Sequence, residues 1–176
     1  AIILPVRNEE PCLPRVLEEL QPVAERLGAV MAVGVNSSTD RSAELARRHG
    51  ALAGETSTLG YGHGCRAAIR AVQEAGYLPS AYLFVSGDGS NDPSDLPRLV
   101  ERYQSGAAMV IGQRTLRWAN WGPFGPRRAL PNLTLGILTT VLTARPFCDI
   151  GPLRLIDRRL YECMDLQELV WGWTIE

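Results

Sequence analysis

A short polar segment, S-G-D-G-S-N-D-P at residues 86–93, directly follows the apolar run 82–85. A carboxylate placed after a buried strand, on a glycine-flanked turn, can reach both a hard cation and the oxygens of a diphosphate, the arrangement that Mg²⁺ or Mn²⁺ favours. We therefore predict that Asp88 is a metal ligand and catalytic residue. The alternative is that Asp88 is an Asp-Gly turn residue. Asp92 precedes Pro93, which favours an N-cap role for Asp92.

Polar residues follow other expected strands as well. They are residues 7–10 after strand 1–5, residues 36–40 after strand 30–35, and Gln113 with Arg114 after strand 108–111. Ligands of open parallel sheets bind at the carboxyl ends of the strands. Any one of these groups taken alone has a structural explanation, because helix caps need polar residues. Four groups together indicate a binding site.

The segment 60–64, G-Y-G-H-G, resembles a phosphate-binding loop that leads into a helix N-terminus. It has neither the Lys-Ser/Thr of a P-loop nor the G-x-G-x-x-G order of a dinucleotide site. His63 is interpreted as a loop residue. Arginines gather around the aperiodic stretch 113–126, and their guanidinium groups suit phosphate. For Arg117, Arg127 and Arg128 a solvated surface is the alternative, whereas Arg114 ends a strand on the ligand side.

Apolar runs alternate with helix-like segments, which favours a mostly parallel α/β sheet with crossover helices. Helices are expected at 11–27, from the cap residues 37–40 to about 48, at 64–76, 93–104 and 128–144. Strands are expected at 1–5, 30–35, 82–85, 108–111 and 153–156.

The bulk properties limit the function classes. The 176 residues are enough for one domain, and a net charge of −1 provides no field for nucleic acid. The 4 cysteines are scattered, which predicts neither a zinc site nor a disulfide framework, and favours a reducing cytoplasm. No apolar run reaches the roughly 18 residues of a membrane span. The chain starts within an apolar run without Met, so we expect it to be truncated at one or both ends.

The motifs, taken in order, resemble the family-2 inverting glycosyltransferases, particularly the branch similar to dolichyl-phosphate and polyprenyl-phosphate sugar transferases. The resemblance covers essentially the whole chain. It rests on residues 3–10 (like P-x-x-N-E-E), 38–40 (like G-S-T-D), 60–64, 87–93, 112–114 (like G-S-R), 149–154 and 171–176. It implies a single domain, 1–176, with the GT-A fold.

The resemblance also implies roles for individual residues. A UDP- or GDP-sugar donor would be bound by Pro5, Asn8, Glu10, Asn36, Ser38, Gly64, Gly87 and Asp88. Arg114, Arg127 and Arg128 would meet the phosphate of a lipid acceptor. Such an anionic acceptor needs no strong base, and for a hydroxyl acceptor Asp149 would be the base. The helix 128–144 would offer apolar surface to a lipid tail, or would be a core helix. The enzyme would then be cytoplasmic, at the inner face of a membrane.

Two residues depart from the family pattern. Ser86 stands where the family has the first acid of its D-x-D pair, so it would contribute to the metal site without charge, and Val35 stands where an Asp contacts the base. Three hypotheses follow: an active enzyme that relies on Asp88, a protein with an altered donor or no metal, and a binding protein without transfer activity. A nucleotidyltransferase is disfavoured, because residues 7–10 are acidic and lack glycine.

Overall fold

A computed structural model describes residues 1–112, 153–164 and 166. The chain divides into two compact units, Ala1–Val110 with Leu153–Glu176, and Ile111–Pro152. The sheet and helices below are built almost entirely from the first unit. The predicted loop 113–126 and helix 128–144 lie outside the described residues.

The sheet has six strands in the order β3-β2-β1-β4-β6-β5. They are β1 (Ile2–Val6), β2 (Met31–Asn36), β3 (Leu52–Thr56), β4 (Ala81–Phe84), β5 (Met109–Ile111) and β6 (Arg154–Asp157). The pairs β1-β2, β1-β4 and β2-β3 are parallel, whereas β6 runs antiparallel to β4. The expected mostly parallel sheet is confirmed, and the carboxyl ends of β1, β2 and β4 meet at one edge.

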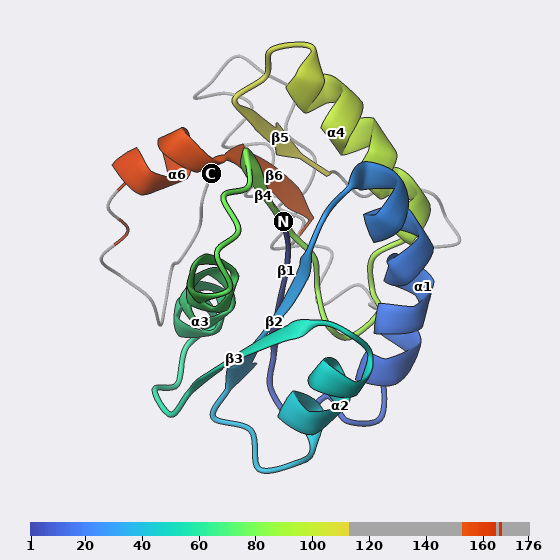
Figure 1. Ribbon diagram of the computed structural model, residues 1–176, viewed down its shortest axis with the longest axis vertical. Helices are drawn as coiled ribbons and strands as arrows, with labels where there is room; N and C mark the ends of the chain where they lie inside the picture. The colour runs from blue at the N-terminus through green and yellow to red at the C-terminus, as the bar shows by residue number, and fades with distance from the viewer. Residues whose placement is uncertain (113–152, 165, 167–176) are drawn as a thin grey trace, which may run out of the picture. The chain divides into compact units, whose positions relative to one another are not determined.

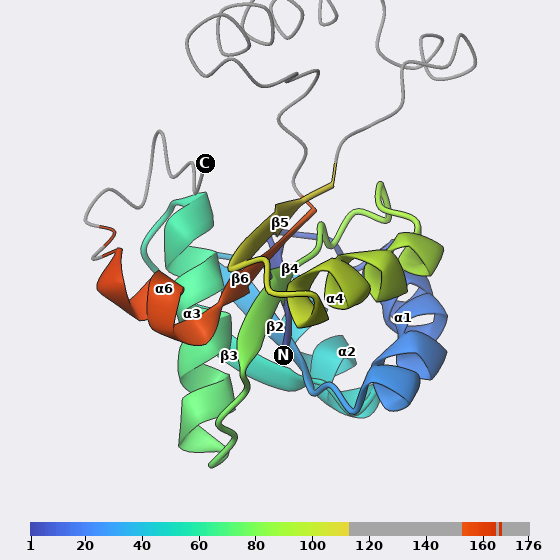
Figure 2. The same ribbon diagram turned by 90° about the horizontal axis from the view of Figure 1, so that it is seen from above.

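Helices cover both faces of the sheet (Figures 1 and 2). One face packs against α1 (Leu13–Leu27), α2 (Ser42–Arg48) and α4 (Leu96–Gln104), the last preceded by the 3-10 turn η1 (Pro93–Asp95). The other face packs against α3 (Tyr61–Glu74) and α6 (Arg158–Cys163). Among the helices that the structure describes, none is long and apolar enough to span a bilayer.

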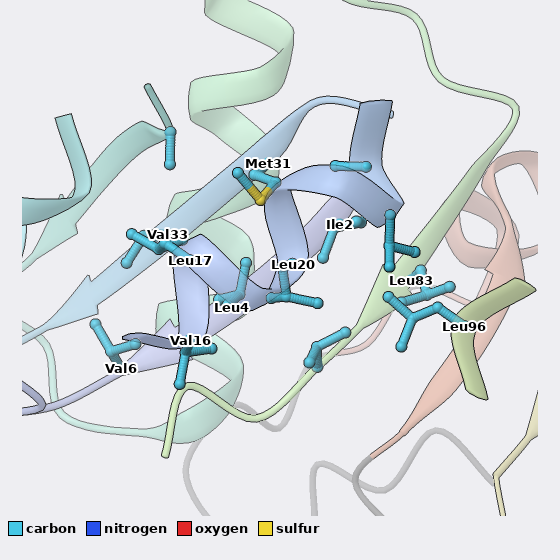
Figure 3. Packing of buried hydrophobic residues seen from close by; sticks show 14 of the residues in the cluster. Ile2, Leu4, Val6, Val16, Leu17, Leu20, Met31, Val33, Leu83 and Leu96 are labelled. Atoms are coloured by element: carbon cyan, nitrogen blue, oxygen red, sulfur yellow. The ribbon is translucent and has the colours of Figure 1, made fainter. Parts of the chain in front are cut away.

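Alternation along the strands divides the core into two layers. Ile2, Leu4 and Val6 of β1 face α1, and Figure 3 shows Leu17 and Leu20 of that helix packed among them and Met31 and Val33 of β2. Ile3 of β1 faces the other way, toward α3. Because both faces are covered, the inner strands are apolar on both sides, as parallel strands usually are.

Glycines let α3 approach the sheet closely. A Cβ on Gly34 of β2 would overlap the carbonyl oxygen of Gly64, and one on Gly54 of β3 would overlap that of Ala67. Gly64 itself lies close to Gly34 and Pro5. The helix backbone therefore rests directly on the strands, which fixes the N-terminus of α3 at the carboxyl edge of the sheet.

Most predicted elements are confirmed within one or two residues, but the start of α3 is wrong. The helix begins at Tyr61 rather than near Gly64, so the glycine-rich segment forms its first turn. Glycine in that turn is explained by the contacts of Gly64 with β1 and β2. The residue pattern predicts no bounds for β3, because its residues are only partly buried.

Candidate functional site

The loop after β1 is bound to the loop after β2. The N–H of Asn8 donates to Ser38 Oγ (3.1 Å), and Asn8 Oδ1 accepts from the N–H of Thr39 (2.8 Å). The Glu10 carboxylate accepts from the backbone N–H of Arg41 (3.0 Å) and from its Nε (2.8 Å). Asn8, Glu10 and Ser38, all predicted to bind the donor, are thus brought together and bonded across the two loops.

A second set of bonds lies beneath this first one. The hydroxyl of Ser42, which is fully buried, accepts from the N–H of Glu9 (3.2 Å) and donates to Asp40 Oδ1 (2.7 Å). Asp40 Oδ2 accepts from the N–H of Glu10 (2.9 Å). Burial opposes ionisation of Asp40, but hydrogen bonds from Ser42 and the Glu10 amide outweigh it and lower the pKa of the carboxyl. The loop after β1 is therefore held by an anion at the start of α2.

The two loops also contain the described non-glycine residues with positive φ. Asn8 has φ 55° and Ser37 has φ 51°. The left-handed region is uncommon for residues with a side chain, and Asn tolerates it best. Ser37 is held there by its N–H bond to Thr56 O (2.7 Å) and its hydroxyl bond to Ser57 O (3.0 Å). Strain of this kind concentrates at functional sites and persists where surrounding bonds define the backbone.

Asn36, at the end of β2, fixes the turn that leads into α3. Its side chain is buried, its Nδ2 donates to Thr58 O (2.7 Å), and its Oδ1 accepts from the N–H of Gly60 (3.2 Å). Both ends of the carboxamide are thus used within the protein. A Cβ on Gly64 would lie 3.3 Å from Pro5 Cβ and 3.4 Å from Asn36 Cβ, so three of the predicted donor-binding residues lie together.

The loop after β4 is shaped by its own polar side chains. The N–H of Ser86 donates to Asn91 Oδ1 (2.7 Å), and Asp88 Oδ1 accepts from the N–H of Ser90 (2.9 Å). Gly89 has φ 77°, where a side chain would also meet the guanidinium of Arg15. Gly87 packs on Val6 so closely that a Cβ there would overlap it. The loop therefore lies directly against the end of β1.

Asp92 caps the next helix, as predicted. Its Oδ1 accepts from the N–H of Ser94 (2.9 Å), and Pro93 occupies the first helical position. The helix starts as the 3-10 turn η1 before α4 continues it.

The charges of Asp88 and Asp40, from two other loops, act on Glu9 in the loop after β1. Burial, the charge of Asp88 and then that of Asp40 raise the pKa of Glu9. Burial opposes ionisation of Asp88 too, but hydrogen bonds from Ser86 and Ser90 lower its pKa. Glu9 has no role in the sequence-based prediction, which places Glu10 of the same acidic pair in the donor site; Glu10 is hydrogen-bonded to Arg41.

Few of the described residues could hold a metal. In residues 1–112, 153–164 and 166, no group of at least three His, Cys, Asp or Glu side chains could hold a metal ion. Asp88, with the hydroxyl of Ser86 bonded to it, offers one carboxylate. Mg²⁺ in phosphate-transfer sites commonly uses one or two carboxylates and takes its other ligands from substrate phosphates and water. Among the described residues, this donor set fits a cation delivered with a diphosphate rather than one held by protein groups alone.

Of the two departures, Val35 lies in the hydrophobic core. Its side chain is buried in the layer between the sheet and α1, where an acid would be desolvated. The predicted acceptor residues Arg114, Arg127 and Arg128, the predicted base Asp149 and the motif 171–176 lie outside the described residues.

Known proteins resemble this chain in sequence. Residues 1–165 match the family model described as glycosyl transferase family 2. An uncharacterized glycosyltransferase of Mycobacterium tuberculosis strain H37Rv is 36% identical over 113 residues, which are 64% of this chain and 47% of that protein. The undecaprenyl-phosphate 4-deoxy-4-formamido-L-arabinose transferase of Pseudomonas paraeruginosa is 34% identical over 133 residues, 69% of this chain and 38% of that protein. The chain thus spans less than half the length of these two relatives.

Solved structures show the same fold. The glucosyl-3-phosphoglycerate synthase of M. tuberculosis, in complex with Mn²⁺, UDP and phosphoglyceric acid, superimposes with a TM-score of 0.66 at 18% identity. The match covers 90% of this chain and 55% of the synthase chain. From the sheet order, the loops at its carboxyl edge and the family match together, the chain belongs to glycosyl transferase family 2 and has the GT-A fold.

Proposed function

We propose that the chain forms the donor-binding part of an enzyme that transfers a sugar, with inversion, from a UDP- or GDP-sugar to an acceptor. The acceptor is a polyprenyl or dolichyl phosphate at the inner face of the membrane. The Pseudomonas relative is named as an undecaprenyl-phosphate sugar transferase, and this supports the choice of acceptor.

The observation that carries this proposal is the convergence of three loops. Those after β1, β2 and β4 bring acids and small polar groups to one edge of the sheet, and Gly87 packs on Val6 at the centre of it. This is the edge where α/β sheets bind nucleotides.

Asp88, with Ser86 beside it, would hold a Mg²⁺ or Mn²⁺ ion that neutralises the diphosphate leaving group. The pKa of Asp88 is lowered, so its carboxylate is ionised at neutral pH. Pro5, Asn8, Ser38, Gly64 and Gly87 would line the donor site through their backbone and short side chains.

The chemistry then rests on position and charge. An acceptor oxygen forms a bond to the anomeric carbon as the bond from that carbon to the diphosphate oxygen breaks on the opposite face, which inverts the configuration. A phosphate acceptor is already an anion, so Arg114, Arg127 and Arg128 would orient it and no base would be needed. A hydroxyl acceptor would require Asp149 as a general base.

The test is calorimetry of UDP- and GDP-sugars, with and without Mn²⁺. We expect one of these donors to bind more tightly when Mn²⁺ is present, and Asp88→Asn to abolish the increment from the metal. Asp92→Asn is the matched control, because Asp92 lies in the same loop and caps η1. If no donor binds at millimolar concentration, the proposal is wrong.

Ser86 favours a second candidate, a protein that binds a nucleotide sugar without transferring it, because a hydroxyl adds no charge at the metal. Ser86→Asp separates the two. An active enzyme binds Mn²⁺ more tightly with this change and keeps turning over, whereas a binding protein gains metal affinity and shows no sugar transfer in either form.

A further inference from the structure

We propose that Asp40 and Ser42 are positioning residues of the donor site, which hold the loop after β1 in the conformation that receives the nucleoside diphosphate. This inference rests on the proposed function. Neither residue belongs to the proposed donor or metal ligands, and both act through other residues.

The connection is made through two consecutive amides. Ser42 Oγ accepts from the N–H of Glu9 and Asp40 Oδ2 accepts from the N–H of Glu10, at 3.2 and 2.9 Å. Ser42 Oγ in turn donates to Asp40 Oδ1 at 2.7 Å. One anion and one hydroxyl therefore fix the peptide units on both sides of Glu9.

The anchor itself is buried and hydrogen-bonded. Ser42 has no exposed surface, and its N–H also donates to Asp40 Oδ1 (3.1 Å) at the start of α2. α2 is attached to the sheet through Ala46, which is fully buried in the core. The hydrogen bonds of Ser42 and Asp40 thus tie the backbone at Glu9 to a helix that packs on the core.

The carbonyl side of the Glu9 peptide connects the anchor to α1 and to the proposed donor site. The carbonyl of Glu9 accepts from the N–H groups of Cys12 (3.0 Å) and Leu13 (2.8 Å), so the same peptide also sets the start of α1. Residues 7–10 are therefore held from both ends, and the Glu9 side chain stays within the field of Asp88. A site that receives a diphosphate at Asp88 needs this loop preorganised, because ordering it on binding would reduce affinity.

The experiment measures UDP binding to the full-length protein by calorimetry, with and without Mn²⁺. We expect Asp40→Ala and Ser42→Ala each to weaken UDP binding at least about tenfold, by the same factor with and without Mn²⁺. Asp40→Asn keeps an oxygen that can accept from the Glu10 amide, and should recover part of the affinity. Hydrogen exchange of the Glu9 and Glu10 amides should accelerate in both alanine variants.

Asp157→Ala is the matched control. Asp157 also accepts from two helix amides, those of Arg159 (2.8 Å) and Leu160 (3.2 Å), but it lies at the far end of β6. It should lower the melting temperature as Asp40→Ala does and leave the Kd for UDP unchanged.

Three outcomes are distinguishable. UDP affinity within about twofold of wild type in both alanine variants overturns the positioning role. Loss in Asp40→Ala of only the Mn²⁺ increment also overturns it, since Asp40 would then be a metal ligand. A wild-type protein that binds neither UDP nor a UDP- or GDP-sugar defeats the proposed function, and this inference with it.

Discussion

At the scale of single residues, the loops of the site are organised by side chains that bond to backbone groups. Asn8, Asn36 and Asp40 each bind amides or carbonyls of a neighbouring loop. Short polar side chains do this well, because they reach nearby backbone groups at little entropic cost. Glu9 differs, since its carboxylate is partly buried beside other acids.

Glu9→Gln should stabilise the protein at neutral pH. The folded-state pKa of Glu9 is raised above its ordinary value of 4.5, so the folded state favours the protonated form and loses stability as pH rises through that pKa. A neutral amide removes the desolvation cost of the charge and the repulsion from Asp88 and Asp40, with a gain below about 1 kcal/mol because the group is largely solvated. Thermal unfolding should show the gain at neutral pH and none at about pH 4, where the carboxyl is largely protonated in both states. An equal gain under both conditions would contradict the ionisation of Glu9 as the source of the gain.

Asp92→Ala should lower the urea midpoint of unfolding, because it removes the oxygen that accepts from the Ser94 amide. Asp92→Ser keeps an oxygen at the N-cap and should restore most of the loss. An unchanged midpoint in the alanine variant would mean that solvent satisfies the cap.

At the scale of elements, the position of α3 depends on glycines, which have no side chain, where the helix meets the sheet. Gly34, Gly54 and Gly64 let its backbone touch β2 and β3, and this brings its first turn to the site. The helix itself could be predicted from the glycine-rich turn 60–64 before it and Gly76 after it. Its start could not, because glycines that serve close packing have the same sequence appearance as glycines that bind phosphate.

Gly34→Ala should therefore be strongly destabilising, by about 3 kcal/mol or more, since the new methyl would overlap the carbonyl of Gly64. Gly76→Ala is the comparison: it adds a methyl at φ 80° in open space, so only the backbone strain of about 1–2 kcal/mol applies. Equal losses in urea unfolding would mean that α3 moves away from the sheet at little cost.

The strand-end loops could be predicted as a group for a simple reason. Polar residues after apolar runs are visible in sequence, and parallel topology brings their ends together. What could not be predicted is which side chain faces which loop. Glu9 and Glu10 are adjacent and of the same residue type, yet Glu10 pairs with Arg41 while Glu9 lies near Asp88, and residue type does not distinguish them.

At the scale of the whole molecule, the sheet joins segments that are far apart in the chain. Ala81–Phe84 pairs with Arg154–Asp157, and Tyr82 packs edge-on against Tyr161 with ring centroids 5.3 Å apart. The returning segment thus supplies both a strand and part of the core on the α3 face.

Ile156→Ala tests how much the stability of the protein depends on the packing of β6. The side chain is fully buried, so truncation should destabilise the protein by about 2–5 kcal/mol. Leu78→Ala, at a side chain that is 81% exposed, should change stability little. Chemical unfolding followed by both fluorescence and circular dichroism should give coincident transitions for Ile156→Ala. Separate transitions would mean that β6 detaches alone.

The position of β6 between β4 and β5 also sets an order of assembly. Among the described strands, β5 has β6 as its one neighbour. β5 is made before β6, so its pairing with β6 must wait until Arg154–Asp157 has been synthesised. On the ribosome, β1 to β4 can pair first, which leaves the edge of β4 open during that interval. An unpaired edge of this kind is where a nascent chain is most exposed to aggregation and most dependent on chaperones.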